Sequence, residues 1–182
     1  MIEAGLRGAF MLARGQAHGV MLIEDTLEGA ARSFWAAAIC LPGLLALLLL
    51  DWADEPPAAE IGYALLAHLI ARAGGWAGFA VASHAVAQAA GRAAAWPHFI
   101  AAWNWANVVQ YLLLLAVSLP ALLGLPRPLS SALALATLGY QLWLVFFLAR
   151  TTLNSRGLAT TMLGLDLLIG VVVEALVAAL TG

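Results

Sequence analysis

Residues 158–180 read LATTMLGLDLLIGVVVEALVAAL, and this stretch indicates what kind of fold the chain has. A helix rises about 1.5 Å per residue, so a run of this length crosses the roughly 30 Å of hydrocarbon in a bilayer. Two acidic residues, Asp166 and Glu174, interrupt the apolar run, and a polar turn, RTTLNSRG, precedes it. The stretch therefore predicts a transmembrane helix that carries two carboxyl groups inside the membrane.

Four further apolar runs lie upstream, and charged or turn-forming residues bound each of them. They cover residues 33–50, 61–81, 99–123 and 131–149. A membrane β-barrel would instead require alternating strands of about ten residues. We therefore predict an all-α fold, a polytopic membrane helix bundle with five transmembrane helices in a domain of residues 33–182.

The composition excludes several classes of protein. Of the 182 residues, 64% are hydrophobic and 10% are charged, whereas an ordinary soluble domain has about 25% charged residues. A net charge of -2 with no lysine argues against a nucleic-acid partner, which would require a basic patch. The single cysteine, Cys40, excludes a disulfide framework within the chain. No catalytic motif or metal-ligand spacing such as HExxH occurs, so the sequence predicts no enzyme, no cofactor and no metal site.

The distribution of arginine predicts the orientation of the helices, because short loops rich in Arg stay on the cytoplasmic side. With five spans, the amino terminus and the loops after the second and fourth spans share one side. Six arginines fall on that side: Arg7, Arg14, Arg32, Arg92, Arg150 and Arg156. The opposite side holds Arg127 and the acidic loop of residues 51–60. We predict a multi-pass protein of the cell inner membrane with a cytoplasmic amino terminus and a periplasmic carboxyl terminus.

Residues 1–32 are predicted to form a cytoplasmic lead-in with an amphipathic pattern. On a helical projection, one side collects the polar residues Glu3, Arg7, Arg14 and His18. The opposite side collects the apolar residues Ile2, Leu6, Phe10, Ala13 and Val20. The pattern predicts an N-terminal amphipathic helix that either lies in the membrane interface or packs on the chain's own spans. Asp25 or Thr26 is the predicted cap of a further helical turn that leads into the first span.

Ionisable residues inside a membrane are costly, so they indicate a functional site. Four residues qualify: His68 and Arg72, one turn apart on the second span, and Asp166 and Glu174 on the fifth. At about 1.5 Å per residue, Arg72 lies about 16 Å from the outer end of its span, and Asp166 lies at nearly the same depth. We therefore predict a buried ion pair between Arg72 and Asp166, with His68 near Glu174.

Three interpretations of the predicted ion pair are open. In the first, the two charges neutralise each other and fix the helix register, with no role in transport. In the second, they belong to a proton or ion relay in which His68 titrates near neutral pH and the acids exchange partners. In the third, Arg72 extends to a membrane surface and pairs with neither acid.

The third span opens with a polar and aromatic stretch, WPHFIAAWNWANVVQY, at residues 96–111. The polar side chains of this span that share a predicted face, together with two on the fourth span, are Asn104, Asn107, Tyr111, Tyr140 and Gln141. Such groups either join helices by hydrogen bonds or line a ligand site. The pattern predicts a polar face and leaves these two roles open.

A glycine cluster, GGWAG, lies at residues 74–78 of the second span. It contains a GxxxG pattern, which in an apolar helix is typical of close helix packing. We therefore predict that Gly74 and Gly78 face a neighbouring helix rather than a phosphate group.

The carboxyl half of the chain resembles a known family. The stretches WPHFIAAWNWANVVQYLLLL and YQLWLVFFLARTTLNSRGLATTMLGLDLLIGVVVEALV, within residues 96–177, give a polar-aromatic start to the third span and two spans around a short arginine-flanked turn. This layout is similar to the bacterial Yip1-like membrane proteins. The resemblance implies a five-span fold and a scaffold-like role without a catalytic reaction. In eukaryotic relatives the family is associated with vesicle traffic and small-GTPase binding.

These features lead to one main functional hypothesis and two alternatives. The main hypothesis is a non-enzymatic scaffold in the lipid bilayer that binds a membrane protein partner or forms a homo-oligomer. The alternatives are a small proton-coupled permease that uses His68, Arg72, Asp166 and Glu174, and an accessory subunit of a larger membrane complex. Richness in Ala and Arg without Lys additionally favours a high-GC bacterial source.

Overall fold

The structure is a computed structural model that describes residues 2–182, except the side chains of Ala121 and Leu122. Within this range the chain is helical and contains no strand. Its elements are α1 (Ile2–Ala13), η1 (Ala17–Leu22), α2 (Leu27–Ser33), α3 (Trp35–Asp54), α4 (Ile61–Ala89), η2 (Ala93–Ala95), α5 (Trp96–Leu122), α6 (Arg127–Leu153) and α7 (Arg156–Thr181).

Five segments of the described chain are helical, apolar and long enough to cross a membrane, as predicted. They correspond to α2 with α3, to α4, to η2 with most of α5, to α6 and to α7. The second helix is longer than predicted, because α4 continues to Ala89 instead of ending near residue 81. Alanine and glutamine in this extension are good helix formers. The helix ends just before Gly91, whose φ of 68° is a left-handed conformation that glycine adopts without strain.

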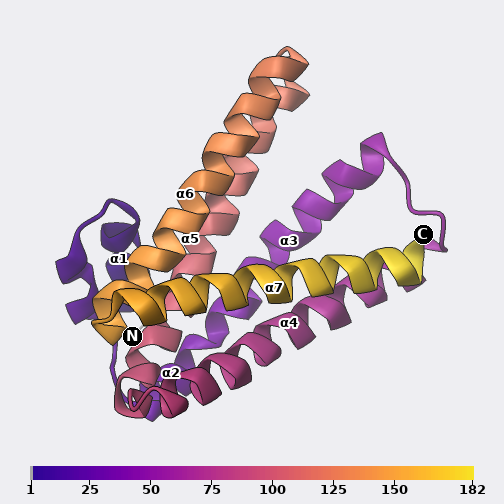
Figure 1. The fold of residues 1–182 in the computed structure, drawn as a ribbon. Helices are drawn as coiled ribbons and strands as arrows, with labels where there is room; N and C mark the ends of the chain where they lie inside the picture. The colour runs from indigo at the N-terminus through magenta and orange to yellow at the C-terminus, as the bar shows by residue number, and fades with distance from the viewer. Residues whose placement is uncertain (1) are drawn as a thin grey trace.

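Two antiparallel helix pairs dominate the architecture. α5 and α6 form one hairpin, and α4 packs along α7 to form the other pair (Figure 1). The two pairs diverge from a shared end, which we call the base, where α4 connects to α5 and α6 connects to α7 (Figure 1). α3 packs on α5.

The base is held by a compact apolar core. Phe79, Phe99, Leu153 and Met162 are fully buried there and come from four different helices. The turn between α6 and α7 is short because Asn154 adopts a left-handed conformation with φ 50°, and the Ser155 side chain then caps α7 by accepting a hydrogen bond from the Leu158 N–H. The core and this turn hold the two pairs together at the base.

The N-terminal helix α1 packs on α5, which is one of the two placements that the sequence predicted. Its fully buried residues are Gly5, Gly8, Ala9 and Leu12, and two of the predicted apolar residues, Leu6 and Ala13, pack partly buried against the same core. A Cβ atom at Gly5 would lie 2.5 Å from the indole of Trp105, so only glycine allows this approach. The helix therefore contacts its neighbours through small residues.

Two large apolar residues of α1, Ile2 and Phe10, lie outside the face that contacts the other helices. Ile2 and Phe10, from the predicted apolar side, are each 41% exposed. Glu3 and Arg7, from the predicted polar side, are exposed as well. The projection thus identified the exposed polar side, and its apolar residues Leu6 and Ala13 pack on the core, but it missed the glycine contacts. It ranked residues by hydrophobicity, while close helix packing selects small side chains.

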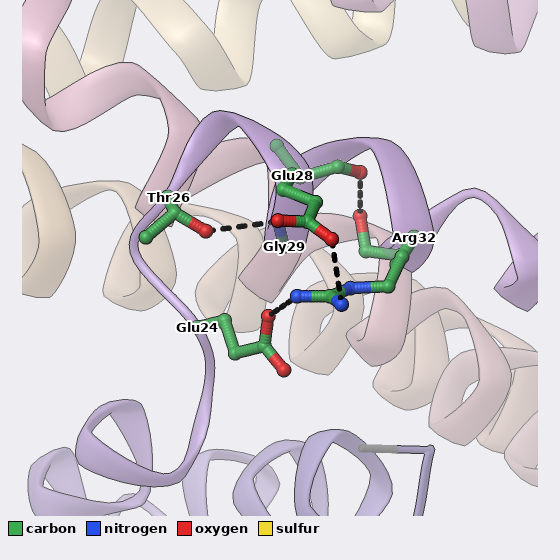
Figure 2. Close-up of polar contacts among 7 residues, drawn as sticks. Glu24, Thr26, Glu28, Gly29 and Arg32 are labelled. Atoms are coloured by element: carbon green, nitrogen blue, oxygen red, sulfur yellow. Dashed lines mark hydrogen bonds and ion pairs between the residues drawn. The ribbon is translucent and has the colours of Figure 1, made fainter.

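The segment before α2 is fixed by local polar contacts (Figure 2). Thr26 caps α2 by accepting a hydrogen bond of 3.0 Å from the Gly29 N–H, which confirms one of the two predicted caps. Arg32 donates to Glu24 at 2.5 Å and to Glu28 at 3.0 Å. The guanidinium therefore joins the loop to the helix and fixes the direction in which the chain enters α3.

Candidate functional site

The ion pair that forms between the helices joins Arg72 of α4 to Glu174 of α7. The Nη2 of Arg72 donates to the Oε1 of Glu174. Their side chains are 37% and 60% exposed, so neither charge is enclosed by protein alone. The predicted pair between Arg72 and Asp166 is wrong.

The register of α4 on α7, aided by side-chain direction, explains why Glu174 rather than Asp166 is the partner. Gly75 packs against Val173, and Ala71 packs with Val173 and Val177. Arg72 therefore lies level with Glu174, while Asp166 lies about two turns nearer the base. Every Cα–Cβ bond of a helix leans toward the amino terminus of that helix. α4 and α7 are antiparallel, since the Ala59 N–H donates to the Thr181 carbonyl over 3.2 Å. Arg72 therefore leans away from the base while Glu174 leans toward it, and the two converge. Asp166 leans toward the base and away from Arg72.

Asp166 is hydrogen-bonded to α5. Its Oδ1 accepts from the Trp103 Nε1–H at 3.1 Å. Among the described residues this is the one hydrogen bond to the carboxyl group, and no basic side chain forms an ion pair with it. Asp166 thus contributes a carboxyl group without a neutralising partner.

His68 makes its closest contacts with α3 and with its own helix. Its Nδ1 lies 2.9 Å from the Ala64 carbonyl oxygen, one turn back on α4, and its ring meets Trp52 edge-on with centroids 5.6 Å apart. In the described part of the chain, His68 forms no hydrogen bond or ion pair with Glu174. The predicted association of His68 with Glu174 is therefore not a bonded contact.

Asn104 joins three helices at full burial. It accepts from the Trp76 Nε1–H at 2.6 Å and donates to the Ser33 Oγ at 2.7 Å. Ser33 in turn donates to the Ala30 carbonyl at 2.6 Å. This network links α2, α4 and α5, so Asn104 has the helix-joining role and not the ligand-lining one.

A small cavity lies between α4, α5 and α7, and we call it the aromatic pocket. Its volume is about 190 Å³. Four aromatic side chains line it together with three polar ones: Trp76, Phe79, Trp103, Tyr111, Arg72, Asn107 and Asp166. Asn107 and Tyr111 thus share a face as predicted, whereas Asn104 turns toward Ser33.

A larger cavity lies between α7 and the α5–α6 hairpin, and we call it the cleft. Its volume is about 760 Å³. The polar residues that line it are Arg72, Gln110, Gln141, Asp166 and Glu174, and the apolar wall includes Leu138, Leu142, Leu167 and Val171. Arg72, Asp166 and Gly170 line both the cleft and the aromatic pocket, so the two cavities meet at these residues.

Some predicted residues lie outside these cavities. The Tyr140 hydroxyl donates to the Ala13 carbonyl at 2.6 Å and so fastens α1 to α6, while its neighbour Gln141 lines the cleft. The predicted contact residues Gly74 and Gly78 have no neighbour within 4 Å of an added Cβ among the described side chains. Gly75 instead packs against Val173, so the GxxxG prediction selected the wrong glycines.

Two lining residues were missed by the sequence analysis. Gln110 is an amide within an apolar run, and that position alone was a signal for an interhelical or ligand-facing group. Trp76 stood inside the glycine cluster, and no feature of the sequence distinguished it from an ordinary packing residue. Both lie among the groups that define the cavities.

The architecture is compatible with an integral, multi-pass α-helical membrane protein whose charged groups gather where two helix pairs diverge. Comparisons with protein-family models, with curated proteins and with solved structures find no match for this chain.

Proposed function

We propose that the chain is a non-enzymatic membrane scaffold that binds one transmembrane helix of a partner protein in the cleft. The observation that carries the proposal is the set of polar groups exposed at membrane depth between α7 and the α5–α6 hairpin. Glu174 is 60% exposed there, and hydrocarbon would not accommodate an exposed carboxylate. Another molecule must cover these groups.

The amides of the cleft favour a helix as this molecule. Gln110 and Gln141 form no side-chain hydrogen bond with any described residue, and both line the cleft. An unpaired amide in hydrocarbon costs several kcal/mol. Serine, threonine, asparagine or glutamine on a neighbouring transmembrane helix would satisfy such groups. We therefore expect a partner helix with at least one uncharged polar side chain.

The dimensions of the cleft agree with a helix as the occupant. Its lining on α7 extends from Asp166 to Ala178, which corresponds to about 18 Å of helix axis at about 1.5 Å per residue. The cavity of about 760 Å³ holds roughly two turns of a helix about 10 Å across. The wall beside the amides is apolar, as the surface of a transmembrane helix requires.

The remaining expectations from the sequence belong to the same proposal. The resemblance to bacterial Yip1-like proteins agrees with a scaffold role in the inner membrane. The arginine distribution supports a base on the cytoplasmic side, since Arg92 and Arg150 are exposed near it. Exposed Ile2 and Phe10 on α1 would then reach the lipid headgroups while α5 holds the helix.

Site-specific photocrosslinking in native membranes tests the proposal. A photoreactive residue at Leu142, in the cleft, should give one discrete adduct with a membrane-spanning protein. The matched control is Leu66, which is 56% exposed on α4 and lines neither cavity. Gln110→Leu should weaken the Leu142 adduct because it removes an unpaired amide. Equal adduct patterns at Leu142 and Leu66, or lipid adducts alone, would contradict partner binding in the cleft.

The mass and composition of the adduct distinguish a homo-oligomer from an accessory subunit of a larger complex. In the reciprocal experiment, a photoreactive residue in the crosslinked segment of the partner protein should form an adduct with α6 or α7. An adduct of twice the chain mass identifies a second copy of this chain, whereas a stoichiometric complex of several proteins identifies an accessory subunit.

A small proton-coupled permease is the second candidate function. It is favoured by Asp166, an intramembrane carboxyl group without an ion-pair partner among the described residues that lines two joined cavities. Proton-driven solute uptake into proteoliposomes, lost in Asp166→Asn, would support it. Uptake that is equal in parent and variant vesicles would exclude it.

A further inference from the structure

The aromatic pocket has a composition that the scaffold proposal does not use. It encloses about 190 Å³, the volume of about six water molecules in the liquid. Its walls combine aromatic rings with the Asp166 carboxyl group and the Arg72 guanidinium, whose partner Glu174 lies outside the pocket. Aromatic rings next to a carboxyl group favour a ligand that carries a positive charge.

The charges of the pocket leave one carboxyl group to be neutralised. Two carboxyl groups and one guanidinium lie around the junction of the cavities. Arg72 is already paired with Glu174, and in the described structure Asp166 accepts a single hydrogen bond, from the neutral indole of Trp103. A ligand with one positive charge would balance Asp166 without breaking the Arg72–Glu174 pair.

The aromatic rings of the pocket also suit a cation. Trp103 stacks on Phe79 with ring centroids 4.3 Å apart, which covers one face of each of these rings, and Trp103 meets Trp76 edge-on at 5.5 Å. Tyr111 completes the aromatic lining. The face of an aromatic ring carries partial negative charge and attracts ammonium groups, most strongly for tryptophan. Tryptophan supplies two of the four rings here.

An organic cation fits these groups better than a metal ion. Calcium and magnesium require about six oxygen ligands or more, and transition metals prefer imidazole or thiolate. In the described part of the chain, no group of three or more His, Cys, Asp or Glu side chains comes together. The oxygen atoms in the pocket belong to Asp166, Asn107 and Tyr111, too few for a hard metal ion.

We propose that the aromatic pocket binds a small monovalent organic cation of the alkylammonium class, with its charged head against Asp166 and its alkyl groups against Trp76, Trp103 and Tyr111. The ligand enters from the cleft, because the two cavities join at Asp166 and Gly170. This chain alone forms the site, and a partner helix in the cleft would close the entrance, so binding is measured on the purified chain.

The experiment measures binding of choline to the purified full chain in lipid nanodiscs by isothermal calorimetry and tryptophan fluorescence. The control ligand is 3,3-dimethyl-1-butanol, which has the same shape but carries carbon in place of the charged nitrogen. Choline should bind at least about tenfold more tightly than the neutral analogue, as expected for a cation over desolvated rings and a carboxylate. Equal affinities for the two ligands would overturn the proposal.

Two variants test whether the charged head of the ligand lies against Asp166. Asp166→Asn keeps an acceptor for Trp103 and removes the charge, so choline affinity should fall at least about tenfold. Asp54→Asn, an exposed acid at the end of α3, is the matched control and should bind as the parent does. An Asp166→Asn variant that binds choline with parent affinity would overturn the proposal.

A blocking variant covers the case in which Asp166→Asn does not fold. Gly170 lines both cavities, and an added Cβ there meets no described atom within 4 Å, so Gly170→Leu should fold and occlude the junction. Gly164→Leu, on the same helix and equally open, is its control and lines neither cavity. Choline binding should be lost in Gly170→Leu and kept in Gly164→Leu. Retained binding in Gly170→Leu would overturn the proposal without affecting the crosslinking test of the scaffold.

Discussion

The α5–α6 and α4–α7 pairs are both antiparallel, yet different side chains hold each of them. α5 and α6 meet through an apolar core that includes Ala106, Leu144 and Leu148, and α1 adds Ala9 and Leu12 to this core. α4 and α7 meet through Ala71, Gly75 and Val173, with an ion pair beside them. The first pair depends on apolar volume, whereas the second depends on close backbone approach and on charge. The charged groups of the candidate site, Arg72, Asp166 and Glu174, therefore lie on the pair with the smaller core.

Loss of apolar volume in the α5–α6 pair should have the largest effect. Leu148 is fully buried there, and Leu148→Ala should lower the free energy of unfolding by about 2–5 kcal/mol because it leaves a cavity. Denaturation by SDS in mixed micelles measures this quantity. The control Leu135→Ala, at a residue 68% exposed on the same helix, should change it by less than about 0.5 kcal/mol. Equal losses in the two variants would mean that the pair is not held by this core.

Added volume should disturb the α4–α7 pair at one glycine and not at its neighbour. A Cβ at Gly75 would lie 2.7 Å from the Val173 Cγ2, so Gly75→Ala should cost about 1–3 kcal/mol of stability. At Gly74 the added Cβ meets no described atom within 4 Å, and alanine is the better helix former by about 1 kcal/mol. The same SDS titration should thus rank Gly74→Ala at or above the parent. The reverse ranking would place α7 on the other side of α4.

This pair of glycines also shows what the sequence could predict. Five helices followed directly from the apolar runs, since length and hydropathy suffice to recognise a span. The same sequence did not distinguish Gly75 from Gly74, because that choice depends on the rotation of α4 about its axis. In an apolar helix, hydrophobicity does not indicate which face meets a neighbour.

The candidate site was predictable in content but not in pairing. Arg72, Asp166 and Glu174 were identified as intramembrane charges, and all three line the cleft. The estimated depth favoured Arg72 with Asp166 because the second span was taken to end near residue 81. Since α4 continues to Ala89, the register on α7 brings Arg72 level with Glu174. Gln110 was missed because the projection followed Asn104, Asn107 and Tyr111.

A double-mutant cycle tests the ion pair between α4 and α7. Arg72→Gln, Glu174→Gln and the double variant should give a coupling free energy of about 1 kcal/mol, and the swap Arg72→Glu with Glu174→Arg should recover part of the loss. Thermal denaturation in detergent at low and high salt measures the coupling. A second cycle of Arg72→Gln with Asp166→Asn is the control and should give a smaller value. If Asp166 couples more strongly than Glu174, the register of α4 on α7 is incorrect.

The smallest effect concerns the attachment of α1 to the α5–α6 pair. Tyr140→Phe removes the hydrogen bond to the Ala13 carbonyl and should weaken this attachment by about 0.5–1.5 kcal/mol. Because Arg14 is exposed next to that carbonyl, limited trypsin digestion in nanodiscs should cleave there several times faster in the variant. Tyr63→Phe is the control, since Tyr63 is 48% exposed at the start of α4. Unchanged cleavage in Tyr140→Phe would mean that apolar and glycine contacts alone hold α1, and the ion pair would then be a polar attachment that only the α4–α7 pair has.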